Sequence, residues 1–391
     1  MTQSIPSPRR LRLGVIGLGR AFMLMLPGLR AHPYYALVAA ADPNGASRAS
    51  FASEFGARVY ETDEALCGDP EVDAVYIATP HQFHAANTLV AASARKHVLV
   101  EKPMALSLAD CEAMIAACGA AGVALVVGHS HSFDAPIRRA REFVVSGEFG
   151  AVRLVHALNY TDFLYRPRRP EELDPGAGGG VIFNQAPHQV DVARLLCGGS
   201  ATSVRAVTGA WDRTRPVDAA YSALVTFENG AVASLTYSGF GHFDSDELMN
   251  WIGESGAVKN AEQYGAARRH LRSGDEALLR RARGYATAAA AKEAPAHRPH
   301  FGPLVVSCER ADLRPMPDSI WVYGDDSRRQ ETLPPTRPRQ EVLDAFYDAA
   351  IHGRQPVQTG AWGLATMEVC LAIRESARQG RDVALSHQVG I

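Results

Sequence analysis

The stretch Gly14-Val-Ile-Gly17-Leu-Gly19-Arg-Ala-Phe22 closes the apolar run Leu11 to Ile16 and opens a segment of helical character, Arg20 to Ala31. A strand, a glycine turn and a helix in this order are typical of the first unit of a parallel sheet. Gly17 permits the tight turn, and Gly19 lets an anion approach the backbone at the helix N-terminus. Phe22 replaces the usual third small residue. We expect it to widen the helix–strand spacing or to form a pocket wall.

The rest of the first half alternates short apolar runs with helical segments. This alternation favours a doubly wound parallel α/β sheet, a Rossmann domain over residues 1–128. Thr62 and Ser107 are expected to cap the helices that follow them. The expected strands are Leu11 to Ile16, Ala36 to Ala41, Arg58 to Tyr60, Val72 to Ala78, His97 to Val100 and Val123 to Val127, and the expected helices are Arg20 to Ala31, Gly45 to Phe55, one beginning at Thr62, His84 to Ala94 and Ser107 to Ala121.

Asp42 ends the second expected strand. A carboxylate there can accept hydrogen bonds from the hydroxyls of an adenosine ribose and would repel a 2′-phosphate. The glycine turn and Asp42 together predict a nicotinamide dinucleotide site with NAD rather than NADP. The alternative is an Asp that caps the next helix.

Two later segments follow strands of the same sheet and should form further walls of the cofactor cleft. Ala78-Thr79-Pro80 precedes His84, which either contacts the ribose or nicotinamide or packs in a turn. In Glu101-Lys102-Pro103, the proline restricts the backbone of Lys102 to extended conformations. A lysine held in this way can direct its ammonium into the cleft and stabilise a developing alkoxide. A solvated lysine is the alternative. The predicted cofactor contacts are Gly17, Leu18, Gly19, Arg20, Ala21, Phe22, Asp42, Thr79, Pro80, His84, Glu101 and Lys102.

The second half, residues 129–391, changes to consecutive strand-like runs. Asn229-Gly230 between two such runs predicts a hairpin. We expect an α/β domain with an open, mostly antiparallel mixed sheet, a helix over Pro187 to Leu196 and a helical excursion over Ala261 to Pro299. The expected strands are Val152 to Ala157, Ala201 to Gly209, Ala220 to Phe227 and Ala231 to Phe240, with Leu304 to Cys308 paired to Ser319 to Tyr323, and the closing helices are Gln340 to Ile351 and Gly363 to Arg378.

A glycine-rich segment in this half, Gly178-Gly179-Gly180, leads to Asn184, His188 and Asp191. Spacings of four and three place these side chains on one face of a helix. His188 is the candidate that accepts the substrate hydroxyl proton, and Asn184 is expected to orient it. A structural histidine is the alternative for His188.

The segment Tyr165-Arg166-Pro167-Arg168-Arg169 gathers three guanidinium groups on a stiff backbone. Such a group binds carboxylates in two-pronged fashion. It is equally consistent with a basic loop neutralised by Glu171 and Glu172, or with an oligomer contact. The predicted substrate contacts are Tyr160, Tyr165, Arg166, Arg168, Arg169 and His188.

The net charge, the lengths of the apolar runs and the spacing of the cysteines argue against several classes of protein. The 391 residues carry a net charge of −2, so a global basic field for nucleic acid or membrane is absent. No run is long and apolar enough to span a membrane, and no signal peptide is evident. The six cysteines form no Cys-x-x-Cys pair, which favours reduced thiols in a cytoplasmic protein. His129 and His131 lack a carboxylate or thiolate at supporting spacing, so we expect no metal.

The order of Gly17-Leu-Gly19, Ala78-Thr79-Pro80, Glu101-Lys102-Pro103 and the glycine-rich segment before His188 resembles the glucose–fructose oxidoreductase/inositol dehydrogenase/MocA superfamily. The resemblance covers nearly the whole chain. It implies a tightly held nicotinamide cofactor, Lys102 as the active-site lysine and His188 as the acid/base. It also implies homodimers or homotetramers assembled through the second sheet. Family members often have Asp where Asn184 stands, so a relay through a charged carboxylate is in doubt.

Within the superfamily, the segment from Asn159 through Leu173 and the segment beginning at Phe301 look like the phthalate 4,5-cis-dihydrodiol dehydrogenase group. This resemblance implies NAD-dependent oxidation of a carboxylated cis-dihydrodiol to a catechol, with the arginines as carboxylate anchors. Two rivals remain: a sugar or inositol dehydrogenase that uses the same Lys102 and His188, and a regulator that binds NAD without turnover.

Overall fold

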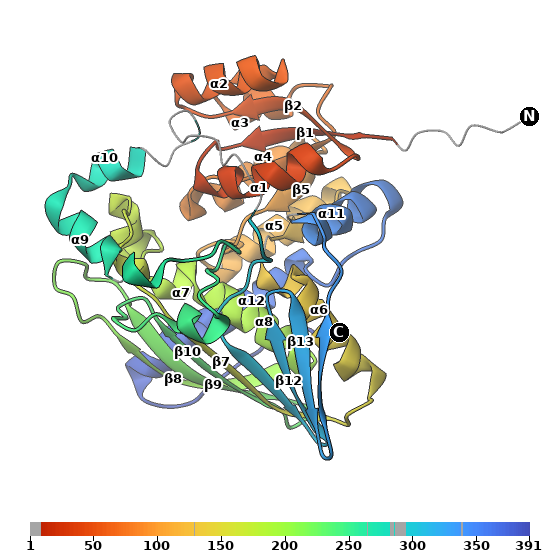
Figure 1. Cartoon of the computed structure of the whole chain (residues 1–391). Helices are drawn as coiled ribbons and strands as arrows, with labels where there is room; N and C mark the ends of the chain where they lie inside the picture. The colour runs from red at the N-terminus through yellow and green to blue at the C-terminus, as the bar shows by residue number, and fades with distance from the viewer. Residues whose placement is uncertain (1–8, 129, 264, 282–284, 286–294, 338) are drawn as a thin grey trace, which may run out of the picture.

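The computed structural model describes residues 9–391 except 129, 264, 282–284, 286–294 and 338. Its first half forms a parallel six-stranded sheet with the order β3-β2-β1-β4-β5-β6 (Figure 1). This is the Rossmann order that the glycine turn and the strand–helix alternation predict. The strands are β1 (Leu11–Ile16), β2 (Tyr35–Ala41), β3 (Arg58–Tyr60), β4 (Ala74–Ile77), β5 (His97–Val100) and β6 (Leu125–Val127).

The helices between these strands begin at polar caps. The side chains of Asn44, Thr62 and Ser107 each accept hydrogen bonds from backbone N–H groups in the first turn. The caps at Thr62 and Ser107 confirm the sequence expectation. The helices are α1 (Arg20–Ala31), α2 (Gly45–Phe55), α3 (Asp63–Cys67), α4 (His84–Ser93) and α5 (Leu108–Ala121).

The second half forms a nine-stranded sheet with the order β14-β13-β12-β11-β7-β10-β9-β8-β15. Among the strands that the structure describes, β7 and β10 are its one parallel pair, so the sheet is mixed and mostly antiparallel, as expected. The Asn229-Gly230 turn joins β9 to β10, and Gly230 has a φ of +83°. The strands are β7 (Val152–Tyr160), β8 (Ala201–Gly209), β9 (Ala220–Phe227), β10 (Val232–Ser238), β11 (Leu304–Cys308), β12 (Ala311–Met316), β13 (Ser319–Gly324), β14 (Arg328–Thr332) and β15 (Val383–Ala384).

The predicted pairing of Leu304–Cys308 with Ser319–Tyr323 is wrong. An additional strand, β12, lies between them and pairs with both. Its sequence contains Asp312, Arg314 and Pro315, which weaken any strand signal. The residues that pack inward, Ala311 and Leu313, are nevertheless buried. Burial on one face of the sheet therefore overrides the poor local propensity.

Helices of the second half cover one face of the large sheet and separate it from the first domain (Figure 1). They include α6 (Ala135–Ser146), which the sequence reading missed, α7 (Val181–Asn184), α8 (Ala186–Cys197) and α12 (Gly360–Gln379). Two helices, α9 (Ala266–Ser273) and α10 (Glu276–Arg281), confirm helical character in part of the excursion, of which residues 264, 282–284 and 286–294 lie outside the described part of the chain.

Helix α11 (Gln340–His352) returns to the first domain although it comes late in the chain. Its Val342, Leu343 and Phe346 are fully buried in the core of the first sheet. The Tyr35 hydroxyl donates to the carbonyl oxygen of Leu343 at 2.7 Å. The division near residue 128 stays a prediction, and the first core clearly recruits residues from beyond it.

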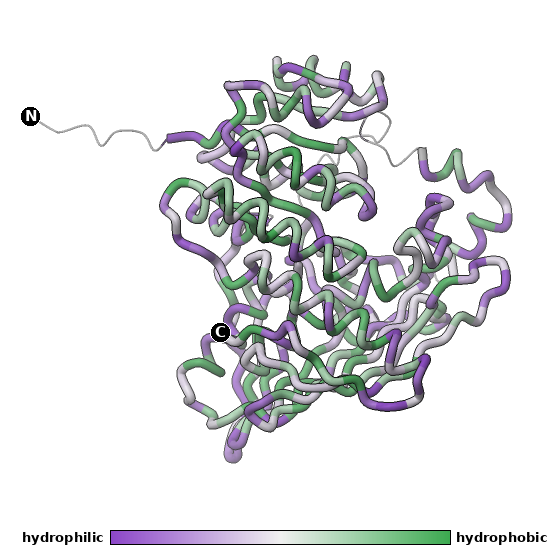
Figure 2. The backbone as a smooth tube through the Cα atoms, turned by 180° about the vertical axis from the view of Figure 1, so that it is seen from behind, coloured by the Kyte–Doolittle hydropathy of each residue, from purple (hydrophilic) through white to green (hydrophobic). Residues whose placement is uncertain are grey.

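Hydrophobic segments follow the strands and the inner sides of the helices, and hydrophilic ones gather at turns (Figure 2). Both sheets are thus built around apolar interiors. Within the described residues, no helix combines the length and the apolar character needed to cross a bilayer.

Candidate active site

A cleft lies between the carboxyl ends of the first sheet's strands and the helices of the second domain. Open parallel sheets place their ligands at this edge. Lys102 from the first domain and His188 from the second both line the cleft, so the sequence-predicted lysine and histidine share one site. The other predicted site residues that line it are Gly17, Gly19, Arg20, Ala21, Asp42, Thr79, Pro80, His84, Glu101, Arg166, Arg168, Arg169 and Asn184.

The glycine turn fits a bound pyrophosphate. Gly17 has a φ of +93°, and a Cβ there would stand 2.9 Å from the backbone of Ala78 and Thr79. A Cβ on Gly19 would meet its nearest neighbour only at 4.0 Å, so the backbone is open to the cleft. In the described part of the chain, α1 has no side-chain cap and no acidic residue in its first turn. Its N–H groups and dipole therefore suit an anionic ligand.

Asp42 stabilises this turn. Its Oδ2 accepts from the Leu18 N–H at 2.7 Å, and its Oδ1 accepts from the Asn44 N–H at 2.7 Å. Leu18 itself is buried and contributes only backbone. Phe22 does not form a cleft wall, because it is fully buried against Phe51 and Tyr285 in the core. The alternative of a Phe22 that lines the pocket is therefore incorrect.

The His84 imidazole lies between two segments that line the cleft, within hydrogen-bond distance of both. Its Nδ1 lies 2.8 Å from the Pro103 carbonyl oxygen, and its Nε2 lies 3.0 Å from the Thr79 carbonyl oxygen. Burial lowers the pKa of this imidazole. The expected contact of His84 with a ribose or nicotinamide is not supported, because both ring nitrogens face backbone. Thr79 donates its hydroxyl hydrogen to Asn87 at 2.8 Å.

Lys102 extends from the end of β5 toward the second domain. Its Nζ donates to the Asn184 backbone oxygen at 2.8 Å, so a hydrogen bond spans the cleft. Burial lowers the pKa of the Lys102 ammonium. Glu101, which precedes Lys102 in the chain, accepts at 2.6 Å from the Tyr76 hydroxyl.

The glycine-rich segment leads into two helices rather than one. Gln185 breaks the helical path between α7 and α8. The Asn184 side chain turns back and donates to the Gly180 carbonyl oxygen at 2.8 Å. Asp191 accepts from the Trp362 indole N–H. The expected orientation of His188 by the Asn184 side chain is not supported, because the Asn184 amide donates to the Gly180 carbonyl oxygen and His188 Nδ1 has no hydrogen-bond partner among the described residues.

His188 is held by ring packing. Its ring centroid lies 4.7 Å from that of Phe301 and 4.8 Å from that of His131. Its Nδ1 is buried and has no hydrogen-bond partner among the described residues. Burial holds the pKa of His188 well below its usual value. The neutral form of the imidazole is therefore favoured, with a lone pair on one ring nitrogen.

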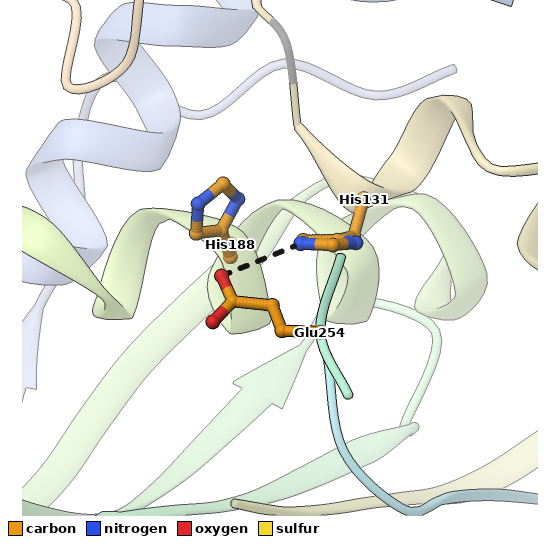
Figure 3. A group of neighbouring side chains, drawn as sticks. All are labelled: His131, His188 and Glu254. Carbon is orange, nitrogen blue, oxygen red and sulfur yellow. Dashed lines mark ion pairs between the residues drawn. The ribbon is translucent and has the colours of Figure 1, made fainter. Parts of the chain in front are cut away.

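His131 and Glu254 join His188 in the cleft (Figure 3). From the sequence, His131 was expected to be a cleft or core histidine without a chemical role, and Glu254 was not identified. His131 Nδ1 lies 2.6 Å from Asp134 Oδ2, and although burial opposes the charged form, this carboxylate raises the pKa of His131. Glu254 Oε1 lies 4.0 Å from His131 Nε2. The position of His131 just after β6, at the ligand edge of the sheet, was the available signal. Its predicted companion His129 lies outside the described residues.

The three arginines line the cleft, and each faces a carboxylate of the protein. Arg166 lies 3.2 Å from Asp162 and 3.6 Å from Glu254, whereas Arg168 and Arg169 both lie 3.3 Å from Glu172. Arg168 also stacks on the Phe163 ring at 3.5 Å, and burial lowers the pKa of its guanidinium to about 10.

The two predicted tyrosine contacts lie away from the cleft lining. The Tyr165 hydroxyl donates to Asp212 at 3.0 Å, and the Arg268 guanidinium covers its ring. Tyr160 ends strand β7, and its ring lies 6.2 Å from that of Phe243. Strand alternation places its neighbours Asn159 and Thr161 on the cleft instead. Both tyrosine assignments are therefore corrected.

Comparison with known proteins agrees with this fold. Residues 11–129 match the model of an oxidoreductase family with an NAD-binding Rossmann fold, and residues 137–259 match the GFO/IDH/MocA C-terminal domain. The chain is 47% identical to a 1-carboxy-3-chloro-3,4-dihydroxycyclohexa-1,5-diene dehydrogenase of Comamonas testosteroni, across 94% of this chain and 95% of that protein.

Solved structures share the fold across nearly the whole chain. A dehydrogenase structure from Bordetella bronchiseptica RB50 has a TM-score of 0.92 and 43% identity, covering 96% of this chain and all of that one. A levoglucosan dehydrogenase in complex with NADH and levoglucosan has a TM-score of 0.74 at 20% identity, with 96% of this chain and 99% of that chain covered. The second likeness concerns the fold alone.

Proposed function

The chain belongs to the Gfo/Idh/MocA family of oxidoreductases and is a dehydrogenase, and we propose that it oxidises a carboxylated cis-dihydrodiol, of the 4,5-dihydro-4,5-dihydroxyphthalate type, to its catechol with NAD. The observation that carries the proposal is one cleft lined by Lys102, His188 and three arginines. The relative that acts on a carboxylated dihydroxycyclohexadiene supports the choice of substrate.

The residues that would hold the cofactor are Gly17, Gly19 and the first turn of α1 for the pyrophosphate, and Asp42 for the ribose. The Asp42 carboxylate favours NAD, because a second negative charge nearby would be repelled. When bound, NAD supplies the acceptor for the hydride that leaves the substrate carbon.

Two residues of the protein take part in the proton transfer and in stabilising the developing negative charge. His188 accepts the hydroxyl proton, and Lys102 stabilises the negative charge that grows on the same oxygen. The bond from Lys102 Nζ to the Asn184 carbonyl oxygen holds the ammonium at the domain junction before substrate arrives. The carbonyl product then tautomerises to an aromatic catechol, which drives the oxidation forward.

The arginines supply the charge that a carboxylated substrate requires. A substrate carboxylate approaching Arg166 or Arg169 would share guanidinium hydrogens now directed at Asp162 and Glu172. These existing pairs also favour a second candidate, a sugar or inositol dehydrogenase. With a neutral polyol the arginines would stay paired with the protein and contribute no substrate contact.

A cofactor-reduction assay over a panel of substrates tests the proposal. We expect NAD reduction with carboxylated cis-dihydrodiols at a kcat/KM at least tenfold above that for neutral dihydrodiols, sugars and inositols. A preference for neutral polyols would support the second candidate. NAD binding with no reduction over the whole panel would point to a nucleotide-binding regulator instead.

A further inference from the structure

We propose that His131, His188 and Glu254 form a binding site for a divalent transition-metal ion such as Zn²⁺, and that an ion bound there inhibits the enzyme. One ligand atom from each of these residues lies within 4.8 Å of the others (Figure 3). The ligands come from three separate segments: the turn after β6, helix α8 and the loop that follows Met249.

The spacing of the donors is close to that of a metal site. Donors of a tetrahedral zinc site stand about 3.3 Å apart, because each bond is about 2.0–2.1 Å long. His131 Nε2 and Glu254 Oε1 are 4.0 Å apart and the three donors lie within 4.8 Å of one another, so side-chain rotation has to bring them closer around an ion. His188 contributes a buried Nδ1 for which the described residues provide no hydrogen-bond partner.

Neighbouring groups orient these ligands. Asp134 lies 2.6 Å from His131 Nδ1 and so directs Nε2 toward the site, which is the carboxylate–histidine arrangement that commonly supports metal ligands. Arg166 faces Oε2 of Glu254 at 3.6 Å, whereas Oε1 faces His131. One oxygen of Glu254 therefore balances the guanidinium while the other faces the His131 imidazole.

The donor set selects the class of ion. Two imidazoles and one carboxylate favour Zn²⁺ and its close analogue Co²⁺ over Mg²⁺ and Ca²⁺, which prefer sites built from oxygen ligands. Three protein ligands leave a fourth position for water.

The expected consequence is inhibition. An imidazole whose lone pair is bound to a metal ion cannot accept the substrate hydroxyl proton. This part of the inference rests on the proposed role of His188, whereas ion binding itself does not.

A Co²⁺ titration of the metal-stripped full chain tests the site directly. We expect the strong visible absorption of four-coordinate Co²⁺ to reach a plateau at one ion per chain and to be displaced by Zn²⁺. Glu254→Gln and His131→Gln should each weaken binding at least tenfold, and Glu247→Gln, at an exposed position in the same region, should not. Thermal melting of each variant checks that it is folded. Absence of strong absorption, or wild-type affinity in folded Glu254→Gln, would overturn the site.

Turnover measured against Zn²⁺ tests the consequence. We expect Zn²⁺ to suppress NAD reduction and a chelator to restore it, with at least a tenfold weaker effect in Glu254→Gln relative to that variant's own activity. Zinc that binds and increases turnover would overturn the inhibitory role. Should no panel substrate be oxidised, the proposed function would fail while the Co²⁺ titration still decides the site.

Discussion

Lys102 and His188 are the residues at which local sequence was most informative. Each belongs to a short motif whose position after a strand or a glycine-rich turn indicated a ligand edge. The fold brings Lys102 and His188 to the same cleft. In contrast, the partners of His188 could not be read from spacing, because His131, Phe301 and Glu254 arrive from distant segments.

Asp42 provides a residue-scale test of cofactor choice. Asp42→Asn keeps an oxygen acceptor for the Leu18 N–H but removes the negative charge. We expect the ratio of kcat/KM for NAD over NADP to fall at least tenfold, or about 1.4 kcal/mol, because repulsion of the 2′-phosphate is lost. Initial rates with both cofactors measure it. An unchanged ratio in a folded variant would remove Asp42 from cofactor discrimination.

Arg166 provides a test of substrate charge. In Arg166→Gln we expect KM to rise at least tenfold for a carboxylated dihydrodiol and less than threefold for a neutral one, because only the first loses an ionic contact. Arg213→Gln, which removes an exposed arginine that does not line the cleft, is the control. Equal changes for both substrates would mean that Arg166 serves the structure of the loop rather than the substrate.

At the scale of elements, capped helices and the Asn-Gly hairpin were predictable because their signals are local. The break between α7 and α8 was not, since Gln185 carries no breaker signal and adopts its conformation in a fully buried segment. Strand β12 was missed for a related reason: tertiary burial stabilises residues of weak strand propensity. Local sequence patterns therefore predict most helices and turns, but they do not predict where a buried segment changes direction.

The contact between helix α12 and the C-terminal tail should make the stability of the fold depend on pH. Burial opposes ionisation of Glu368, yet hydrogen bonds from Gln388, His387 and the Ser386 N–H lower its pKa to about 2 from an ordinary 4.5. A lowered pKa stabilises the fold above pH 4.5, and this contribution disappears as the pH falls toward 2.

We therefore expect Glu368→Gln to lower the free energy of unfolding at pH 7 by about 2 kcal/mol, the scale of hydrogen bonds to a charged group. The difference from wild type should shrink steadily below pH 4.5 in urea titrations. Glu375→Gln, which removes an outer ion pair with Arg378 on the same helix, should change little. A difference independent of pH would show that the Glu368 charge is not what stabilises the tail.

At the scale of the whole molecule, the two-domain α/β architecture was predictable from the change from alternating strands and helices to consecutive strands. The return of α11 to the first core was not, because amphipathic periodicity indicates a buried face without naming its partner. For the same reason the sequence around His131 predicted no metal site, although the fold brings the Glu254 carboxylate to it.

The large sheet also supports a prediction about assembly. Leu154, Val207 and Leu224 are 41%, 64% and 50% exposed on strands of its outer face. We infer that a second copy of the chain covers this face, because exposed apolar sheet faces mark interaction surfaces. Leu224→Glu should shift the mass measured by light scattering toward the monomer, and Glu228→Gln, at the β9–β10 turn, should not. A wild-type chain that is monomeric at all concentrations would contradict the inference.

The central claim is that an ammonium from the first domain and an imidazole from the second act on the same substrate oxygen. A double-mutant cycle of Lys102→Ala and His188→Ala, read as kcat for the preferred diol with NAD affinity as the control, tests it most directly. We predict that each single variant loses at least about 100-fold in kcat and that the double variant loses little more than the worse single one, because groups that act as a unit are not additive. Losses that multiply fully, or a single variant with wild-type kcat, would contradict it.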